Sequence, residues 1–551
     1  MTQKVRLGPV KLEVMRNAYM SVPDEMGAAL RRTAFSPNIK ERMDASCAIF
    51  DAEGRMIAQA EHIPVHLGSM PLAIQFAERE LEGGIREGDH IIVNDPYLGG
   101  SHLNDITMIR PVYRKGKHIG YAVNKAHHSD VGGSTPGSMG GATTELHQEG
   151  LIVPPVRIVS KGQLHRQVLD ILMANTRTPD ERRGDIMAQL ASNDLGAKRL
   201  ASLVDRFGPG THRAFVHENI RYSERLMRAG ISRLPAGTYT AEDFLEGDGL
   251  TEEDIRIVVQ MTVKGSDIHL DFTGTDAQRP GNVNTPYPVA VSSVYFAVKC
   301  VAGPKVPPNH GCYLPIHVTI PVGCLLNPRR PAAVSSGNVE TSQRVADVVF
   351  KALAEAAPGL VGAQSQGTMN NLIIGGLGPD GRGFTYYETL GGGEGARPDR
   401  DGMDGVHTNM TNTANTPIEA LELAYPLRVE AYGLVSGSGG AGRFRGGLGI
   451  ERRIRLLADS GTLSIQSERR RRPPEGLAGG QPGRCGDNSI LRASRDHGEG
   501  VPEALGSKVT LTIHKSDLVI IRTPGGGGYG PPSERSDEAV RWDRKEERAG
   551  S

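Results

Sequence analysis

Six side chains that could bind a metal ion occur within one short stretch of the sequence, residues 94–150. They are imidazoles and carboxylates, namely His102, Asp105, His127, His128, His147 and Glu149. Nitrogen and oxygen ligands of this kind suit a divalent ion without any contribution from thiolate. Glycine pairs at 99–100, 132–133 and 140–141 interrupt the stretch, so these side chains are predicted to lie on sharply bent loops.

Two interpretations of this stretch are open from the residues alone. Imidazoles and carboxylates in glycine-rich loops can simply cap turns, and no fixed zinc motif such as H-E-x-x-H is present. On the other hand, His102 follows the apolar run 91–93, and His127 follows the apolar run 119–123. Each histidine therefore stands just past the end of a predicted strand, where loops commonly hold catalytic groups.

Three polar residues that precede this stretch could join the same site. Asp44, His62 and His66 flank the apolar segments 47–50 and 56–58, which are predicted to form a β-hairpin. Each of them alone is typical of a turn or packing residue. The hairpin could nevertheless bring them close to the other candidate ligands.

The overall composition excludes several classes of function. The chain has 551 residues, and its 63 basic and 63 acidic residues cancel, which argues against nucleic acid as a partner. The five cysteines form no C-x-x-C pair and are odd in number, so a reduced compartment is favoured over a disulfide framework. The sequence has neither a signal-peptide core nor a run of 18 apolar residues. We therefore expect a soluble, cytoplasmic protein without a membrane partner.

The patterning predicts an α+β fold of several domains, with mixed and largely antiparallel sheets. An N-terminal α/β region at 1–165 would carry the metal-site loops, and 166–236 would form a helical insert. A β-rich region with long glycine-rich loops is predicted at 237–532. The charged tail at 533–551 is predicted to be disordered.

Individual helices are predicted at 10–34, 71–82 and 335–357 from the spacing of apolar residues. Pro23 is expected to break or kink the first of these, although it would be tolerated in the first turn of a second helix. The segment 362–450 is rich in glycine, asparagine and threonine, and is predicted to form loops without regular structure. Such loops are costly to order, which favours a role in binding or subunit contact.

Several catalytic motifs are absent from the sequence. It contains no G-x-x-x-x-G-K-[ST] phosphate-binding loop and no G-x-S-x-G nucleophile elbow. The glycine clusters at 391–395 and 525–528 lack the lysine and the helix that phosphate binding requires. A metal-activated water or a metal-polarised carbonyl is the chemistry that the remaining residues best support.

Several sequence blocks resemble the hydantoinase B/oxoprolinase family: NDPYLGGSHLNDITM, NKAHHSDVGG, YETLGGGEGA, HTNMTNTANTPIEALE and TPGGGGYG. The resemblance extends over nearly the whole chain. The family contains B subunits of ATP-dependent hydantoinases and lactamases, the C-terminal part of 5-oxoprolinases, and subunits of acetone and acetophenone carboxylases. One block departs from the family pattern, because Asn409 stands where HTHMTNT has a second histidine. This departure leaves the substrate range open.

The resemblance implies a divalent metal ion, Zn, Mn, Fe or Co, bound in this chain. The family's H-x-x-D pattern with a later histidine gives the ligands as His102, Asp105 and His127, with His147 a further candidate and Asp44 a weaker one. The residues expected to face the substrate or take part in catalysis are His128, Asp130 and Glu149.

The resemblance also implies a partner. A separate hydantoinase A-type subunit would use ATP and Mg, in agreement with the missing phosphate-binding loop, and a hetero-oligomer such as A2B2 is expected. That subunit would phosphorylate a small cyclic amide, and a metal-bound water in this chain would then open the ring. A subunit of an acetone- or acetophenone-type carboxylase is the first alternative, and a non-catalytic scaffold subunit is the second.

Overall fold

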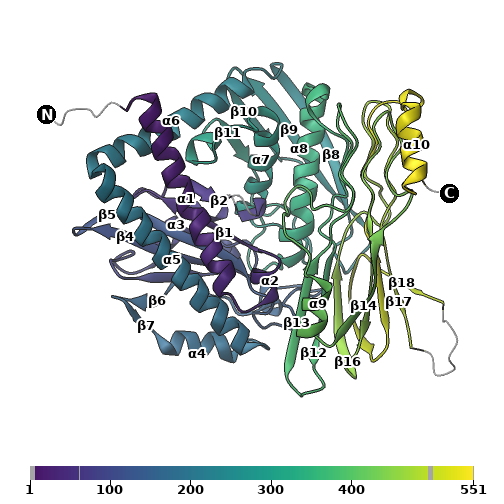
Figure 1. Cartoon of the computed structure of the whole chain (residues 1–551), viewed down its shortest axis with the longest axis horizontal. Helices are drawn as coiled ribbons and strands as arrows, with labels where there is room; N and C mark the ends of the chain where they lie inside the picture. Colours follow the sequence, from purple (N-terminus) through teal and green to yellow (C-terminus); the bar gives the residue numbers. More distant parts are fainter. Residues whose placement is uncertain (1–6, 61–62, 67, 494–500, 550–551) are drawn as a thin grey trace.

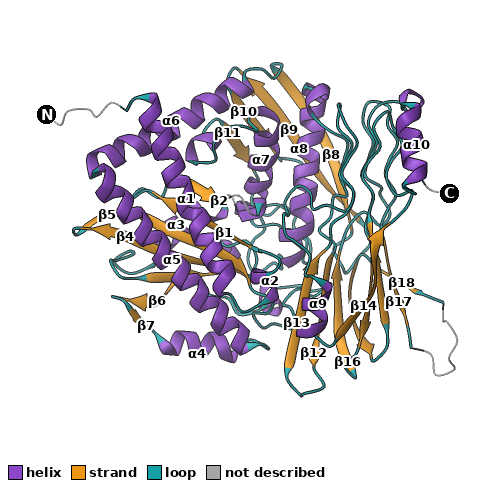
Figure 2. Ribbon diagram, in the orientation of Figure 1, coloured by secondary structure: helices purple, strands orange, loops and turns teal. Residues whose placement is uncertain are grey.

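The structure, a computed structural model, describes residues 7–60, 63–66, 68–493 and 501–549. His62, one of the residues considered as a ligand, lies outside these ranges. The fold is mixed α+β with several largely antiparallel sheets, as the sequence predicted (Figures 1 and 2).

The first sheet, which we call the N-terminal sheet, has seven antiparallel strands in the order β2-β1-β5-β4-β3-β6-β7. Its strands are β1 (Ala45–Phe50), β2 (Met56–Ala60), β3 (His90–Val93), β4 (Asp105–Arg114), β5 (Lys117–His127), β6 (Val156–Ser160) and β7 (Gln163–Leu164). The longest pair, β4 and β5, lies in the middle of the sheet. Its register places Asp105 opposite His127.

Helices cover one face of the N-terminal sheet (Figure 1). They are α1 (Pro9–Thr33), α2 (Pro37–Lys40), α4 (Arg166–Ala174), α5 (Pro179–Phe207) and α6 (Pro209–Ile231). Contrary to the predicted break, α1 continues through Pro23 as one helix. A proline inside a helix costs about 3 kcal/mol, but the neighbouring side chains Tyr19, Val22 and Met26 are buried against the sheet. This packing offsets the lost hydrogen bond.

The opposite face of the N-terminal sheet packs against α3 (Ser69–Glu80), α7 (Tyr287–Ala302) and α8 (Ser342–Ala356). The same core includes a second, four-stranded sheet made of β8 (Gly237–Glu246), β9 (Asp254–Lys264), β10 (Asp267–Asp271) and β11 (Ile316–Thr319). Val123 of the first sheet and Val259 of the second belong to one continuous hydrophobic cluster. The core therefore extends across residue 236, where the sequence suggested a domain boundary.

Two further sheets pack face to face around a separate core. One contains β12 (Asn371–Leu377), β13 (Gly383–Thr389), β16 (Ser460–Gln466) and β19 (Lys508–His514). The other contains β14 (Leu427–Leu434), β15 (Ile450–Leu456), β17 (Asp487–Leu491), β18 (Glu503–Leu505) and β20 (Leu518–Arg522). Strands β12, β13 and β14, with helix α9 (Ile418–Ala424), correct the prediction that 362–450 lacks regular structure. Their apolar side chains, such as Leu372 and Tyr386, gain burial that offsets the cost of ordering.

The C-terminal tail also differs from the prediction, because it contains helix α10 (Asp537–Lys545) instead of disorder. The Ser536 side chain caps the helix by accepting a hydrogen bond from the Ala539 amide. Arg535, just before the helix, pairs with Asp401 and Asp543 at 2.8 Å, which fixes the helix to the preceding loops.

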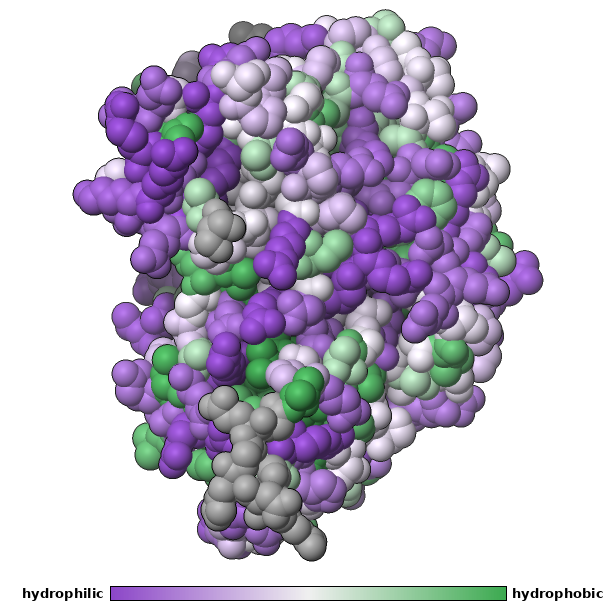
Figure 3. Space-filling view, turned by 90° about the vertical axis from the view of Figure 1, so that its right-hand side faces the viewer, coloured by the Kyte–Doolittle hydropathy of each residue, from purple (hydrophilic) through white to green (hydrophobic). Residues whose placement is uncertain are grey.

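The face of the molecule on the α10 side is largely hydrophilic, with small separate apolar patches (Figure 3). Within the described ranges, no helix combines the length and the apolar composition that a membrane span requires.

Candidate metal centre

One face of the N-terminal sheet changes from apolar to polar along β4 and β5. Ile109 and Val123 belong to the hydrophobic core, whereas Asp105 and His127 lie at the other end of the same strand pair. Side chains alternate across a strand with a period of two, so Val123, Lys125 and His127 share this face. The paired register then brings the carboxylate of Asp105 and the imidazole of His127 together.

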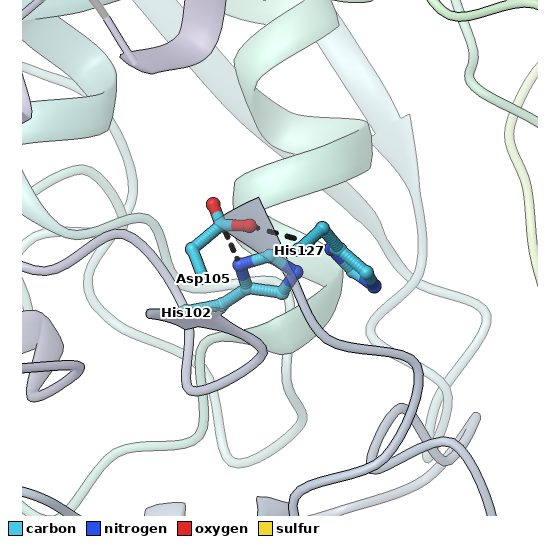
Figure 4. Close-up of side chains that lie close together, drawn as sticks. All are labelled: His102, Asp105 and His127. Atoms are coloured by element: carbon cyan, nitrogen blue, oxygen red, sulfur yellow. Dashed lines mark ion pairs between the residues drawn. The ribbon is translucent and has the colours of Figure 1, made fainter. Parts of the chain in front are cut away.

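Three buried side chains converge at this polar end (Figure 4). Asp105 Oδ2 lies 3.1 Å from His102 Nδ1, and Asp105 Oδ1 lies 3.3 Å from His127 Nδ1. One ligand atom from each residue can be chosen so that all three lie within 4.8 Å of one another. We call these residues the His–Asp–His group. Its donor set could hold a metal ion.

The local electrostatics favour the protonation states that a metal requires. Burial alone would raise the pKa of Asp105, but charge interactions with His102 and His66 hold that pKa well below its ordinary value. Burial lowers the pKa of His127 from its ordinary value. Near neutral pH the group therefore offers a carboxylate and a neutral imidazole, which are the ligating forms.

Two imidazole nitrogens without partners show that the residues present fit a cation. Among the described residues, Nε2 of His102 and Nε2 of His127 make no hydrogen bond. Both side chains are at most 3% exposed, and buried polar atoms without partners are rare. An ion bound between them would satisfy these nitrogens.

A buried hydrogen-bond relay holds Asp105 in place. Ser101 Oγ donates to Asp105 Oδ2 at 2.6 Å, and Lys125 Nζ donates to Ser101 Oγ at 3.1 Å and to Ser69 Oγ at 2.8 Å. Burial lowers the pKa of Lys125 to about 8. No motif in the sequence marks Ser101 or Lys125, although the period-two spacing of Lys125 and His127 could have indicated the lysine.

His66 lies on the other side of Asp105, as the predicted hairpin allowed. Its Nε2 is 3.3 Å from Asp105 Oδ2, and its Nδ1 is 2.9 Å from Ser46 Oγ on β1. The short helix Pro64–His66 presents the imidazole. His66 is therefore a neighbour of the group, with one nitrogen already engaged by Ser46.

A tyrosine from a strand distant in the sequence packs against the group. The ring of Tyr387, on β13, stacks on His127 with ring centroids 4.4 Å apart. The guanidinium of Arg42 lies over the Tyr387 ring, 4.8 Å from its centroid. No local signal marks Tyr387, because only the packing of the third sheet against the first brings it here.

A cavity of about 1170 Å³ lies next to the group, separated from Asp105 by His66, which lines the cavity wall together with Ser46. Residues of α7, α8 and the segment 407–412 line other parts of this cavity. Ligand sites are typically concave spaces of this order of size. A small molecule could therefore approach the His–Asp–His group from this side.

The three residues predicted to be catalytic each have hydrogen-bond partners within the protein, and their catalytic role stays a prediction. His128 is directed to the helix-covered face, where its Nε2 lies 2.9 Å from Gln189 Oε1 on α5. The alternation of side chains along the chain explains this, because adjacent residues point to opposite faces. Burial lowers the pKa of His128 to about 4, so it is neutral.

The carboxylates of Asp130 and Glu149 fasten loops. Asp130 accepts hydrogen bonds from the amides of Gly132, Gly137 and Arg177, each at 3.0 Å, and pairs with the Arg177 guanidinium. Glu149 accepts from the amides of Val334 and Ser335 at 3.0 Å. With their oxygens engaged in this way, the structure gives neither residue contact with the group.

The structure places the further ligand candidate, His147, and the weaker one, Asp44, differently, and their roles as ligands stay predictions. His147, in the short helix Leu146–Glu149, is exposed, whereas a fourth ligand would have to point into the buried centre. Asp44 is 6% exposed. Its negative charge partly opposes the lowering of the His127 pKa that burial causes. The backbone oxygen of Asp44 accepts a hydrogen bond from the His127 amide at 3.0 Å.

Comparisons with known proteins identify the family and agree with the fold. The hydantoinase B/oxoprolinase family model matches residues 8–532. An uncharacterized protein of Methanocaldococcus jannaschii is 43% identical over 98% of this chain and 93% of its own length. The putative B subunit of a D-/L-hydantoinase from Pseudomonas sp. is 35% identical over 98% of this chain and 93% of its own length. The 5-oxoprolinase of Saccharomyces cerevisiae is 36% identical, but the chain spans only 42% of that protein.

Two solved structures share the fold. The ATP-dependent caprolactamase of Pseudomonas jessenii has a TM-score of 0.91 and 30% identity, over 99% of this chain and 95% of the other. An acetone carboxylase has a TM-score of 0.89 and 21% identity, over 98% of this chain and 78% of the other, a likeness that supports the fold alone. The chain therefore belongs to the hydantoinase B/oxoprolinase family.

Proposed function

We propose that this chain is the hydrolytic subunit of an ATP-dependent enzyme that opens cyclic amides such as hydantoin, 5-oxoproline or a lactam. One observation carries the proposal: the His–Asp–His group lies beside a cavity in a chain that shares fold and 30% identity with an ATP-dependent caprolactamase. The likeness to 5-oxoprolinases supports the same class of bond.

A partner polypeptide is proposed to supply the ATP-dependent step. The sequence has no phosphate-binding loop with a lysine. The chain spans 93% of the putative hydantoinase B subunit but 42% of a 5-oxoprolinase, which supports a division of labour between two polypeptides. The partner would phosphorylate the amide oxygen, which makes the ring carbon electrophilic, and a hetero-oligomer such as A2B2 would bring the two sites together.

The His–Asp–His group is proposed to hold a divalent ion such as Zn, Mn, Fe or Co. Such an ion would act as a Lewis acid and make a water molecule nucleophilic at neutral pH. Ser101 and His66 orient the Asp105 carboxylate, and the buried cation of Lys125 balances its charge. Tyr387 keeps solvent from one side of His127, which fixes the imidazole and leaves the approach through the cavity.

The first test compares the metal content of the wild-type chain with that of a His102→Ala/Asp105→Ala double variant. We expect about one equivalent of metal in the wild type and loss of at least 90% of it in the variant, because a ligand pair is removed. Ring opening with an A-type subunit, ATP and Mg should fall at least 100-fold, since metal activation of water accounts for most of the chemistry. Plasma mass spectrometry and an amide-hydrolysis assay provide the two measurements.

A matched control removes the same two residue types from the surface. His217 and Asp205 are 60% and 43% exposed, so the variant His217→Ala/Asp205→Ala should keep its metal and its activity. Equal metal content in the site variant and the control would contradict the proposed site. A metal-loaded wild type that opens no cyclic amide with any partner would contradict the proposed reaction.

A further inference from the structure

The wall of the cavity contains three buried polar atoms that no protein group satisfies. Among the described residues, Gln59 Oε1, His407 Nδ1 and Thr408 Oγ1 have no hydrogen-bond partner, and all three residues line the cavity. Such atoms are rare in folded proteins unless a ligand or water takes the free position. Three of them on one cavity wall indicate a binding surface.

This surface is connected to the His–Asp–His group. His407 Nε2 lies 3.5 Å from Thr413 Oγ1, and Thr413 contacts Arg42. Arg42 in turn lies over Tyr387, whose ring stacks on His127. These contacts link a ligand held by His407 to the proposed metal site through Thr413, Arg42 and Tyr387.

The unsatisfied atoms belong to neutral side chains. Burial, with a smaller contribution from Arg42, lowers the pKa of His407 to about 3, so its imidazole is neutral at physiological pH. Several charged residues elsewhere on the wall are paired, for example Lys351 with Glu475 at 3.0 Å and Arg397 with Glu394. The free hydrogen-bonding capacity of the wall is thus suited to a neutral polar ligand.

Neighbouring contacts fix the segment that carries two of these atoms. Asn409 adopts a left-handed conformation with φ 54°, and its Nδ2 donates to Asp347 Oδ1 at 2.9 Å. Gln343 Nε2 donates to the carbonyl oxygen of Thr408 at 3.1 Å. Asn409, the departure from the family pattern, therefore positions the segment instead of facing the cavity as a free group.

We propose that Gln59, His407 and Thr408 form a cradle that binds the N–H and C=O groups of the amide that stays unphosphorylated in a ring with two such groups, as hydantoin has. This inference rests on the proposed function and adds the residues that recognise the ring. A hydroxyl and a primary amide can both donate and accept, and a neutral imidazole nitrogen can do either according to its tautomer. An amide presents one donor and one acceptor side by side, which this set can match, whereas an anion would require a donor at every position.

The test measures binding of two probes to the full chain without ATP or partner. The probes are 2-pyrrolidinone, which has an amide N–H, and N-methyl-2-pyrrolidinone, which lacks it. We expect wild-type protein to bind 2-pyrrolidinone about tenfold more tightly, because one buried hydrogen bond separates the two probes. Ligand-observed NMR titration gives both dissociation constants.

Variants then locate the contact. His407→Phe should weaken 2-pyrrolidinone binding at least tenfold and remove the preference over the N-methyl probe, while His407→Asn should restore part of it by supplying a donor and an acceptor. Thr408→Val and Gln59→Leu test the cradle independently if His407→Phe does not fold. His217→Phe, at a position 60% exposed, is the matched control and should bind as wild type does.

The outcomes separate this inference from the proposed function. Equal binding of 2-pyrrolidinone by wild type and by folded His407→Phe, Thr408→Val and Gln59→Leu would overturn the cradle, and so would a wild type that binds neither probe. The predicted binding pattern without ring opening in the reconstituted assay would support the cradle and reject the hydrolase. Ring opening that persists unchanged in all three variants would reject the cradle and leave the hydrolase standing.

Discussion

The His–Asp–His group and the glycine-rich bundle beside α10 specify structure in opposite ways. In the group, three side chains of particular chemistry meet: Asp105 and His127 face each other on one strand pair, and His102 lies in the bend just before β4. In the bundle, which we define as residues 391–406, 438–449, 474–486 and 523–530, backbone segments run side by side (Figure 1). In the bundle, glycines have no side chain, and this allows the backbone segments to approach one another closely.

Hydrogen bonds between main chains connect the bundle. The Gly526 amide donates to the Gly447 oxygen at 2.9 Å, and the Gly447 amide donates to the Glu394 oxygen at 2.8 Å. A Cβ atom on Gly526 would overlap the Glu394 carbonyl, and one on Gly446 would overlap the Gly526 carbonyl. The glycine clusters in the sequence therefore maintain close packing, and the structure gives them no phosphate-binding geometry.

A residue's chemical type and its neighbours in the sequence therefore do not by themselves reveal its role in this protein. Glycines that suggest a ligand loop serve as spacers, and carboxylates close to the metal candidates serve as fasteners. Substitutions can separate these roles. Replacing a spacer glycine should destabilise the whole fold, and replacing a buried carboxylate should destabilise one loop region. Replacing an exposed histidine should change neither the stability nor the metal content.

The largest expected effect is on the fold, from Gly526→Val. The new side chain would overlap backbone atoms that cannot move independently, so we expect a loss of more than about 3 kcal/mol of stability or failure to fold. Gly433→Val is the matched control, because nothing lies within 4 Å of a Cβ atom there, and it should change stability by less than about 0.5 kcal/mol. Thermal and urea unfolding measure both. Equal stability of the two variants would break the distinction between spacer and open glycines.

A smaller and more local effect is expected from Asp130→Ala. Removal of this fully buried carboxylate leaves three backbone amides and Arg177 without their acceptor, which should cost about 3 kcal/mol. Metal content should remain near the wild-type value. Asp170→Ala is the control, since Asp170 is 65% exposed and 3.8 Å from Arg183. Loss of metal from a folded Asp130→Ala protein would return Asp130 to the candidate site.

The smallest effect is expected from His147→Ala. This imidazole is exposed, so its removal should change stability by less than about 0.5 kcal/mol. Metal content by plasma mass spectrometry and ring opening should both match the wild type. A metal loss comparable to that of the His102→Ala/Asp105→Ala variant would show that His147 moves into the centre as a ligand, contrary to its place in this structure.

Much of the architecture could be predicted from the sequence, because the signals for it are local. The strands of the hairpin at 45–60, the helix at 69–80 and the helices between 166 and 231 follow from apolar periodicity and turn residues. Three predictions failed, because strands also form within 362–450, where burial offsets the cost of ordering. The other two concern α1 and the tail. Helix α1 passes through Pro23 because packing on the sheet outweighs the lost hydrogen bond, and the tail forms α10 because Arg535 and Ser536 fix its start.

The residues of the candidate site could be predicted only in part from the sequence. His102, Asp105 and His127 share chemical type and places near strand ends, which the sequence displays. Ser101 and Lys125 lie within the same stretch, but serine and lysine are common residue types. Nothing in the sequence indicates that they form the hydrogen bonds that support Asp105. His128 and Glu149 have the same side-chain chemistry as the residues of the His–Asp–His group. Only the tertiary structure distinguishes them from that group, through the face of the sheet for His128 and the hydrogen-bond partners of both.

The sequence by itself determined the residue types of the centre, the strands that carry them and the family, because these depend on local order along the chain. Only the tertiary structure decided which of the candidate ligands meet. The register of β4 against β5 sets Asp105 opposite His127, and the packing of the third sheet on the first places Tyr387 and the cavity beside them. Contacts between segments far apart in the chain leave no trace in local patterns, since any segment of suitable shape could supply them.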